Sequence, residues 1–360
     1  MSKIFLSKNW RFIEKENKIY FFNFVTSKQV EINEDKEMAS SFLKGLQGGI
    51  EKSTLLKKLR NEFPDMSLKW FNDSIKALKK YYIIQNRKIR PSGLSLRYLA
   101  GLDRQLDFLD EMFPNEGGYK KQIELKKIKV AILGLGTISQ YIILPLIASG
   151  VGNFKCVDFD LIEERNIGRQ PIFRRNDIGK SKASVIKDFI KKSRFDIKAE
   201  TKKKMLRGID DVKEFIYGCD IVIHCCDYPR FVIHRWINEA CLSLNIPNLL
   251  VYSGRVGPFS IPFKTSCYGC LETFLKQYVL IYDDFAEKIR KEGLGRYPEL
   301  AVVGALTGTL AAKEIIAYIL GIPVETYNAF FDINPRNVQI IKHPLPRQKK
   351  CYACSSKFKN

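Results

Sequence analysis

A strand–glycine–helix pattern in the middle of the chain constrains its fold more than any other feature of the sequence. Residues 130–133 form an apolar run typical of a buried strand, and Gly134 and Gly136 follow before a helical pattern begins. A second apolar strand ends at Asp158, where dinucleotide-binding motifs carry a ribose-binding acid. Ser139 replaces the third glycine of that motif, so the glycines alone leave nucleotide binding undecided. The layout itself indicates a parallel sheet with helices on both faces.

The rest of the chain after residue 99 continues this alternation of strands and helices. Further strands are expected at 220–226, 248–252, 258–263 and 329–343, and helices at 139–149, 178–192 and 303–320. The last two strands are expected to be antiparallel to their neighbours. We therefore expect an α/β fold, a Rossmann-like domain with a mixed sheet, over residues 99–360.

Residues 1–85 form a smaller α+β pattern. β-rich runs precede helical patterns, and a short strand at Ile83-Ile84 ends the pattern. The expected strands are 10–13, 18–25 and 29–33, and the expected helices are 38–46, 53–63 and 67–82. Ser53 and Ser67 are expected to cap the second and third helices. Residues 86–98 are polar and rich in turn formers, and we interpret them as a linker.

The composition excludes several classes of protein. Hydrophobic residues make up 45% of the 360 residues, which is too many for a disordered chain, and nine cysteines are too few for a disulfide scaffold. No apolar run reaches about 18 residues and the N-terminus lacks an apolar signal segment, so we expect a cytoplasmic protein with no membrane partner. The net charge of +21 suits a polyanionic ligand, but the basic residues are spread along the chain, which argues against a dedicated nucleic-acid surface.

Two cysteine pairs have the spacing of a metal site. Cys267 and Cys270 form one C-x-x-C pair, Cys351 and Cys354 form the other, and 80 residues lie between them. Each pair spans one tight turn, so together they can offer four thiolates at the distances of tetrahedral zinc. Four thiolates leave no open coordination position, so we expect a structural Zn²⁺. The other cysteines are expected to be buried and inert; they are Cys156, Cys219, Cys225, Cys226 and Cys241.

Polar residues cluster after the ends of two predicted strands. They are Asp158, Asp160, Asn166, Arg169, Lys182 and Asp227. A nicotinamide-dependent enzyme has no need of an arginine and a lysine beyond the ribose acid, whereas a site that cleaves a triphosphate uses them to neutralise charge on the departing pyrophosphate. Asp227 follows a parallel strand at the edge where ligands bind, so its carboxylate is well placed to hold Mg²⁺. The set therefore favours ATP cleavage over redox chemistry.

The sequence resembles the E1-like adenylating family. The resemblance lies in the run Asp158-Phe159-Asp160 and in the asparagine, Arg-Gln, Gly-x-x-Lys and aspartate that follow it. That family includes the molybdopterin-synthase and thiamine sulfur-carrier activating enzymes and the ubiquitin-activating enzymes. The resemblance covers residues 99–354. It implies that Gly134 and Gly136 cradle the phosphates of ATP and that Asp158 binds the ribose.

The same resemblance implies roles for the remaining polar residues. Asn166, Arg169 and Lys182 would contact the phosphates, Asp160 would help to bind the nucleotide, and Asp227 would hold Mg²⁺. Arg104, in an Arg-Gln pair upstream of the first strand of the domain, matches the family's arginine that reaches the nucleotide of the partner subunit. A homodimer is therefore implied.

Residues 1–85 resemble the winged-helix-like recognition domain of enzymes that modify ribosomally made peptides. The order of three strands and three helices carries this resemblance. It implies that an extended leader peptide adds as a strand beside residues 29–33, against the helix at 67–82. Two alternatives stay open. One is a dimerisation appendage, and the other is a DNA-binding redox sensor, whose recognition helix would carry Lys69, Lys76, Lys79 and Lys80.

Together the two resemblances imply a peptide-antibiotic maturation enzyme, of the kind that acts on microcin C and pantocin A. Such an enzyme adenylates a carboxylate of a precursor peptide, either the C-terminus or a glutamate side chain, and a nucleophile of the same peptide traps the acyl-adenylate. No cysteine lies within 271–350, where thioester-forming relatives carry theirs, so transthiolation is not expected. Sulfur-carrier activation and non-catalytic peptide delivery stay open as alternatives. His224, His234 and His343 are expected to be structural.

Overall fold

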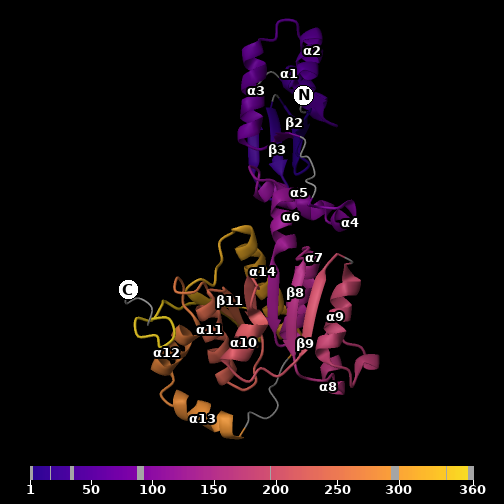
Figure 1. The fold of residues 1–360 in the computed structure, drawn as a ribbon. Coiled ribbons are helices and arrows are strands. Elements are labelled where there is room, and N and C mark those ends of the chain that lie inside the picture. The colour runs from indigo at the N-terminus through magenta and orange to yellow at the C-terminus, as the bar shows by residue number, and fades with distance from the viewer. Residues whose placement is uncertain are drawn as a thin grey trace. The chain divides into compact units, whose positions relative to one another are not determined.

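The computed structural model describes residues 3–16, 18–32, 36–86, 93–194, 196–292, 300–337 and 339–355. They divide into two units, residues 1–123 and residues 124–360 (Figure 1). The expected linker, residues 86–98, falls inside the first unit, although its residues 87–92 lie outside the described part. The division of functions between the two parts of the chain stays a prediction.

The first unit is built on two small antiparallel sheets. One contains, in order, β2 (Trp10–Lys15), β3 (Lys18–Asn23) and β4 (Gln29–Ile32). The other contains, in order, β5 (Ile50–Glu51), β1 (Lys3–Leu6) and β6 (Ile84–Asn86). The helices of this part are α1 (Lys36–Leu46), α2 (Lys52–Glu62) and α3 (Leu68–Lys80). They share a core with the sheets in which Trp10, Phe21, Phe42 and Phe71 are buried. The sequence did not predict β1, which is held in place by its pairing with β6.

The starts of α2 and α3 are set in different ways. Ser67 precedes α3, and its hydroxyl oxygen accepts a hydrogen bond from the Trp70 N–H at 3.1 Å, as expected for an N-cap. The cap expected at Ser53 is wrong, because α2 already begins at Lys52. The strand β5 pairs with β1 immediately before that residue, so strand pairing determines where α2 starts.

Three further helices follow: α4 (Leu96–Leu99), α5 (Asp103–Met112) and α6 (Gly118–Lys127). Leu94 and Tyr98, which come from the expected linker, are buried in a small core, and the Tyr98 hydroxyl accepts a hydrogen bond from Gln122 Nε2 at 2.7 Å. Helix α5 is attached to the turn that precedes β2, because Asn9 Nδ2 donates to the carbonyl of Asp107 at 2.8 Å. Much of the segment after residue 93 is therefore packed structure.

The second unit contains one eight-stranded sheet, in the order β14-β13-β12-β11-β10-β7-β8-β9. Its parallel strands are β7 (Lys129–Leu133), β8 (Asn153–Asp158), β9 (Lys198–Lys203), β10 (Ile221–His224) and β11 (Asn248–Tyr252). Its antiparallel strands are β12 (Arg255–Ser260), β13 (Ala329–Ile333) and β14 (Ile340–Pro344). This mixed sheet confirms the expected Rossmann-like α/β fold.

Helices pack on this sheet and bury its strands (Figure 1). α10 (Ile209–Ile216) and α11 (Val232–Leu244) pack on the face formed by Ala131, Leu133 and Val222. α7 (Thr137–Ala148) packs against α14 (Ala301–Leu320), and α14 also contacts β11, β12 and β13. Gly308 permits the close approach of α14 to α7, because a Cβ there would lie 2.6 Å from the Cβ of Tyr141. The other helices are α8 (Glu164–Ile167), α9 (Lys182–Ser193), α12 (Tyr268–Tyr278) and α13 (Tyr282–Glu292).

Helix α14 is long and apolar enough to span a membrane by length and composition, and no other helix of the described residues is. Half of this apolar stretch is buried inside the structure, and the helix contacts α7 and the sheet. These are the contacts of a core helix. The expectation of a cytoplasmic protein with no membrane partner stays a prediction.

Candidate functional site

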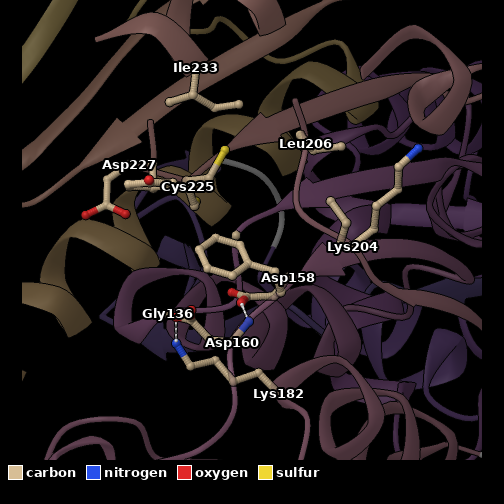
Figure 2. A pocket seen from close by; sticks show the side chains of 14 residues that line it. Gly136, Asp158, Asp160, Lys182, Lys204, Leu206, Cys225, Asp227 and Ile233 are labelled. Carbon is tan, nitrogen blue, oxygen red and sulfur yellow. Dashed lines mark hydrogen bonds and ion pairs between the residues drawn. The ribbon is translucent and has the colours of Figure 1, made fainter. Parts of the chain in front are cut away.

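A cavity of about 110 Å³ lies at the carboxyl edge of the parallel sheet (Figure 2). Turns that follow β7, β8, β9 and β10 contribute to it, so it occupies the place where open α/β sheets bind ligands. Its lining residues are Gly134, Gly136, Val157, Asp158, Phe159, Asp160, Lys182, Lys204, Leu206, Cys225, Cys226, Asp227, Tyr228 and Ile233. The sequence indicated the two glycines, the three aspartates and Lys182, but gave no signal for the apolar and aromatic wall.

The two glycines of the turn after β7 have different tasks. Gly134 has a φ of 92°, and a Cβ there would lie 2.7 Å from the backbone nitrogen of Cys226. This residue must therefore be glycine for the β7 and β10 turns to approach one another. Gly136 is the N-cap of α7, and a Cβ there would meet no atom within 4 Å. The space in front of it is open to an anion at the helix N-terminus.

Asp158 is the last residue of β8, and both oxygens of its carboxylate accept hydrogen bonds from backbone N–H groups. One carboxylate oxygen accepts a hydrogen bond from the Leu135 N–H at 2.6 Å, and the other accepts one from the Asp160 N–H at 2.8 Å. Burial raises the pKa of this carboxyl, although the charge of Lys182 acts in the opposite direction. Asp158 thus fixes the glycine turn to the end of β8.

Asp160 and Lys182 form an ion pair on the wall of the cavity. Lys182 Nζ lies 2.6 Å from Asp160 Oδ2, and the ammonium-bearing side chain is 8% exposed whereas that of Asp160 is 45% exposed (Figure 2). The backbone N–H of Lys182 also donates to the carbonyl of Asp160 at 3.1 Å. A buried lysine whose carboxylate partner is half-exposed can move to a phosphate that enters the cavity.

The start of the helix that carries Lys182 differs from the expectation. We expected a helix from residue 178, but α9 begins at Lys182. Gly179 has a φ of 86°, which is not helical, and Ser181 forms a bridge with Leu161. Because of this turn, Lys182 stands in the first turn of α9, next to the cavity.

Asn166 and Arg169 lie outside the cavity lining. Asn166 is buried, and its Oδ1 accepts a hydrogen bond from the Glu163 N–H at 2.8 Å, so it caps α8. Arg169 Nε donates to the hydroxyl of Thr137 at 3.1 Å. Thr137 follows Gly136 at the start of α7, so this guanidinium stands beside the open helix N-terminus. The phosphate contacts expected of both residues stay predictions.

Asp227 and Arg104 have very different surroundings. The Asp227 side chain is 72% exposed, lines the cavity and lies 3.5 Å from Arg230. An exposed carboxylate of this kind can take a hard cation that keeps most of its ligands from water and phosphate. Arg104 is an exposed residue of α5 in the first unit. Its expected contact with a partner subunit's nucleotide stays a prediction.

The four cysteines of the two C-x-x-C pairs meet in one buried cluster. Their sulfur atoms all lie within 4.8 Å of one another, and the distances are 4.0 Å for Cys267–Cys270, 3.7 Å for Cys267–Cys351 and 3.6 Å for Cys270–Cys354. A tetrahedral zinc with bonds of about 2.3 Å needs sulfurs about 3.8 Å apart, so the cluster is compatible with zinc. A Cβ on Gly269 would lie 2.9 Å from Cys351 Sγ, so the knuckle needs glycine.

One expectation about the cysteines is corrected, and the histidines show a pairing that adds to their expected structural role. Cys225 and Cys226 are only half-buried and line the cavity, so they are not core cysteines as expected, although burial of the sulfur raises the pKa of both thiols. His224 and His234 form a pair that the sequence spacing did not reveal, with Nε2 of the first 2.7 Å from Nδ1 of the second. Burial lowers the pKa of His234 to about 4, which agrees with a structural role.

Comparisons with known proteins agree with this geometry. The profile of the ThiF family matches residues 102–355. The sulfur carrier protein ThiS adenylyltransferase of Escherichia coli is 29% identical over 154 residues, which are 42% of this chain and 60% of that protein. The adenylyltransferase and sulfurtransferase MOCS3 of Culex quinquefasciatus is 26% identical over 261 residues, or 69% of this chain and 52% of that protein. The chain spans about half the length of the curated relatives that it matches.

The fold of the whole chain also has a solved counterpart. A crystal structure of E. coli MccB with AMPCPP and MccA superimposes with a TM-score of 0.74, at 22% identity, over 98% of this chain and 99% of that one. At this identity the likeness concerns the fold. The assignment to a family, however, rests on the sequence, because the residues that match the family profile make up well over half of the protein. The chain belongs to the ThiF family.

Proposed function

We propose that this chain uses ATP to adenylate a carboxylate of a ribosomally made precursor peptide. The observation that carries the proposal is the cavity in which a glycine turn at a helix N-terminus, the acid Asp160 and the buried Lys182 come together. A member of the ThiF family with these groups in one place has what the reaction needs: a phosphate cradle, an acceptor for ribose and a mobile cation.

The ribose contact is proposed for Asp160 in preference to Asp158. Both oxygens of Asp158 already accept backbone hydrogen bonds, so this residue orients the turn. Asp160, in contrast, is half-exposed in the cavity. One of its carboxylate oxygens, Oδ2, pairs with Lys182. When ATP enters, Asp160 accepts a ribose hydroxyl and Lys182 turns toward the phosphates, so one ion pair is exchanged for two contacts with the nucleotide.

The chemical step is a substitution at the α-phosphorus. A carboxylate oxygen of the peptide attacks this atom, the bond from the α-phosphorus to the bridging oxygen breaks, and pyrophosphate leaves with the bonding electron pair. Lys182 and Arg169 neutralise the negative charge that grows on the departing pyrophosphate. Asp227 would hold Mg²⁺, which supplies further charge neutralisation on the phosphates when it is bound.

The four cysteines are proposed to bind one structural Zn²⁺. Four thiolate ligands leave no position for substrate, so the metal would stabilise the fold and take no part in the reaction. The site would link the turn at the start of α12 to the C-terminal segment around Cys351 and Cys354.

The first unit is proposed to recognise the leader of the precursor peptide. A likeness in fold to MccB, which was solved together with MccA, supports this proposal because both chains match over nearly their full lengths. The activated group is either the C-terminal carboxylate or a glutamate side chain, and a nucleophile of the same peptide would consume the acyl-adenylate. Arg104 is proposed to complete the site of a partner subunit in a homodimer.

A second candidate is the adenylation of a sulfur carrier protein. The observation in its favour is the sequence similarity to the ThiS adenylyltransferase of E. coli. The two candidates differ in the need for the first unit, because a carrier protein presents its own folded surface. Turnover of a carrier by a chain that lacks residues 1–85 would favour the second candidate.

The test is ATP–pyrophosphate exchange by the full-length protein with the short peptide encoded beside its gene. We expect exchange that depends on the peptide, on Mg²⁺ and on Lys182. Tight binding of NADH without formation of AMP from any candidate peptide or carrier would refute the adenylation proposal.

A further inference from the structure

The two cysteine pairs share a feature that metal binding does not explain. Each pair has a tyrosine directly after its first cysteine, Tyr268 in the first pair and Tyr352 in the second. A tyrosine in this place is not needed as a ligand by a metal that four thiolates hold. Both rings instead contact residues of α11, the helix that begins beside the nucleotide cavity.

Helix α11 is preceded by the turn 227–231, which belongs to the wall of the cavity. Asp227 and Ile233 both line the cavity (Figure 2), and so does Tyr228. The turn ends at Phe231, the N-cap of α11, which has a φ of 61°. A bulky residue rarely adopts this left-handed conformation, and it persists only where its surroundings hold it. The position of Asp227 therefore depends on the contacts that hold Phe231 and the start of α11.

Tyr268 provides the first set of these contacts. The Phe231 ring packs edge-on against the ring of Tyr282, with centroids 6.1 Å apart, and the Tyr268 hydroxyl donates a hydrogen bond to that of Tyr282. The centroid of the Tyr268 ring also lies 5.2 Å from that of His234. Its backbone N–H donates to Asn238 Oδ1 at 3.1 Å. The first cysteine pair is thus attached to the first two turns of α11 and, through Tyr282, to Phe231.

Tyr352 provides the second set of contacts through a buried carboxylate. Its hydroxyl donates to Glu272 Oε2 at 2.9 Å. The Glu272 side chain is 1% exposed, and it accepts hydrogen bonds from Arg235 Nη2 at 2.6 Å and from Arg235 Nε at 3.1 Å. The guanidinium also lies 5.9 Å from the centre of the Tyr352 ring. Arg235 is in the first turn of α11, so the second cysteine pair also holds the start of this helix.

The ion pair of Arg235 and Glu272 is better suited to orientation than to stability. Burial of a carboxylate costs free energy that its partner barely repays, and apolar side chains in place of such a pair are often at least as stable. The pair does select one geometry, because a planar guanidinium meets a carboxylate through two hydrogen bonds in a fixed arrangement. The same carboxylate binds Tyr352, so the orientation of α11 depends on the second cysteine pair.

We propose that Tyr268 and Tyr352 are positioning residues for the nucleotide cavity, because they hold the start of α11 and thereby fix the turn 227–231 with the carboxylate of Asp227. The cysteine cluster then does more than link the C-terminal segment to the second unit, since its two tyrosines determine the shape of the cavity wall. The inference rests on the proposed function only in taking Asp227 to hold Mg²⁺.

The first test compares Tyr352→Phe with the wild type by hydrogen–deuterium exchange of the full-length protein. The variant loses the hydroxyl but keeps the ring, so the four thiolates should be undisturbed. We expect faster exchange in residues 227–236 and unchanged exchange in residues 130–158, where Asp158 holds the glycine turn without help from the tyrosine. Unchanged exchange in residues 227–236, or faster exchange throughout the second unit, would overturn the proposal.

Tyr278→Phe is the matched control for this variant. It removes a hydroxyl from a tyrosine that is 71% exposed at the end of α12, the helix that carries Glu272. Exchange in residues 227–236 should match that of the wild type. Tyr268→Phe, which loses the hydrogen bond to Tyr282, should behave as Tyr352→Phe does. Equal exchange in the control and in the two test variants would contradict the assignment.

The second test measures peptide-dependent formation of AMP against the concentration of Mg²⁺. If the turn holds Asp227 in its binding position for only a fraction of the time, the apparent affinity for Mg²⁺ falls by that fraction. We expect Tyr352→Phe to raise the Mg²⁺ concentration for half-maximal rate roughly three- to tenfold and to reach the wild-type rate at saturation. A lower rate at saturation with an unchanged dependence on Mg²⁺ would refute a role in positioning Asp227.

A double-variant cycle tests the connection through Glu272. Glu272→Gln removes the charge that Arg235 binds, so exchange in residues 227–236 should rise further than in Tyr352→Phe. Because the tyrosine hydroxyl acts through this carboxylate, adding Tyr352→Phe to Glu272→Gln should change the exchange little more. Additive effects of the two substitutions would mean that Tyr352 acts by another route, and the proposed connection would be wrong.

The outcome is distinguishable from a failure of the proposed function. Exchange in residues 227–236 is measured without ATP, whereas formation of AMP reports on the reaction. A wild-type protein that never forms AMP, but whose variants show the localised change in exchange, refutes the proposed function alone. Formation of AMP by Tyr352→Phe with the exchange and the Mg²⁺ dependence of the wild type refutes the inference alone.

Discussion

In the second unit, the backbone itself holds the residues of the cavity in place, whereas in the first unit side chains of β4 and α3 form a groove of about 270 Å³. Asp158 binds two backbone N–H groups of the cavity, and Gly134 stands where no side chain fits. The groove is lined by exposed or half-buried residues such as Ala77, Tyr81 and Glu31. The difference teaches that single substitutions should abolish function in the cavity but only weaken it in the groove.

The largest expected effect concerns the cysteine cluster. Cys270→Ser removes one of the four proposed ligands from a buried site, so the second unit should lose the proposed zinc and its melting temperature should fall by about 10 °C or more. Metal analysis and thermal unfolding measure the two effects. Cys219→Ala, in a buried cysteine outside the cluster, should keep one zinc per chain. A folded wild-type protein without bound zinc would contradict the assignment.

The next effect concerns the cation of the cavity. Lys182→Ala removes the buried ammonium that is proposed to neutralise the departing pyrophosphate, so we expect turnover to fall about 10²–10³-fold. Lys180→Ala is the control, because that side chain is 55% exposed and pairs with Asp177. Peptide-dependent formation of AMP is measured for both variants. If Lys182→Ala retained its activity, or lost peptide binding by the first unit as well, the assigned role would be wrong.

The two glycines offer a sharper test of the role of the backbone. Gly134→Ala places a methyl group against the backbone of Cys226 at a positive φ, so the free energy of unfolding should fall by on the order of 3 kcal/mol. Gly136→Ala meets no atom of the protein, so it should leave stability unchanged but obstruct the phosphate. Chemical denaturation and ATP binding separate these effects. Equal stability of the two variants would contradict the proposed division of tasks.

The sequence predicted more of the second unit than of the first. The glycine turn, the end of β8 and the cysteine pairs were visible because each depends on residue types at fixed local spacing. The role of Asp158 in orienting the glycine turn was not visible in the sequence, because its partners are backbone groups that only the fold brings together. The pair of His224 and His234 was hidden for the same reason.

In the first unit the missed features depend on pairing between distant segments. Strand β1 has only four residues and is stabilised by β6, about 80 residues later, so its own sequence carries little signal. The start of α2 follows from the pairing of β5 with β1, which overrides the capping preference of Ser53. The aromatic and apolar wall of the nucleotide cavity, with Phe159 and Tyr228, likewise has no local motif.

The smallest expected effect concerns β4, which pairs with β3 alone within the described residues, and the register selects the position to change. A proline at Ile32 would remove an N–H that points to β3 and would damage the sheet itself. A proline at Glu31 removes an N–H that the register directs away from β3, so a leader peptide that adds beside β4, as proposed, would lose one hydrogen bond. That loss is worth about 1–1.5 kcal/mol, or roughly tenfold in the dissociation constant.

Glu31→Ala is the matched control, because it removes the same carboxylate and its ion pair with Lys18 but keeps the backbone donor. We expect Glu31→Pro to weaken binding of the precursor peptide, Glu31→Ala to leave it unchanged or slightly stronger, and both variants to bind ATP as the wild type does. Titration of labelled peptide and of ATP against each full-length variant measures this. Equal peptide affinity in the proline and alanine variants would mean that the peptide does not pair with β4, and the occupant of the groove would then be held by its side chains alone.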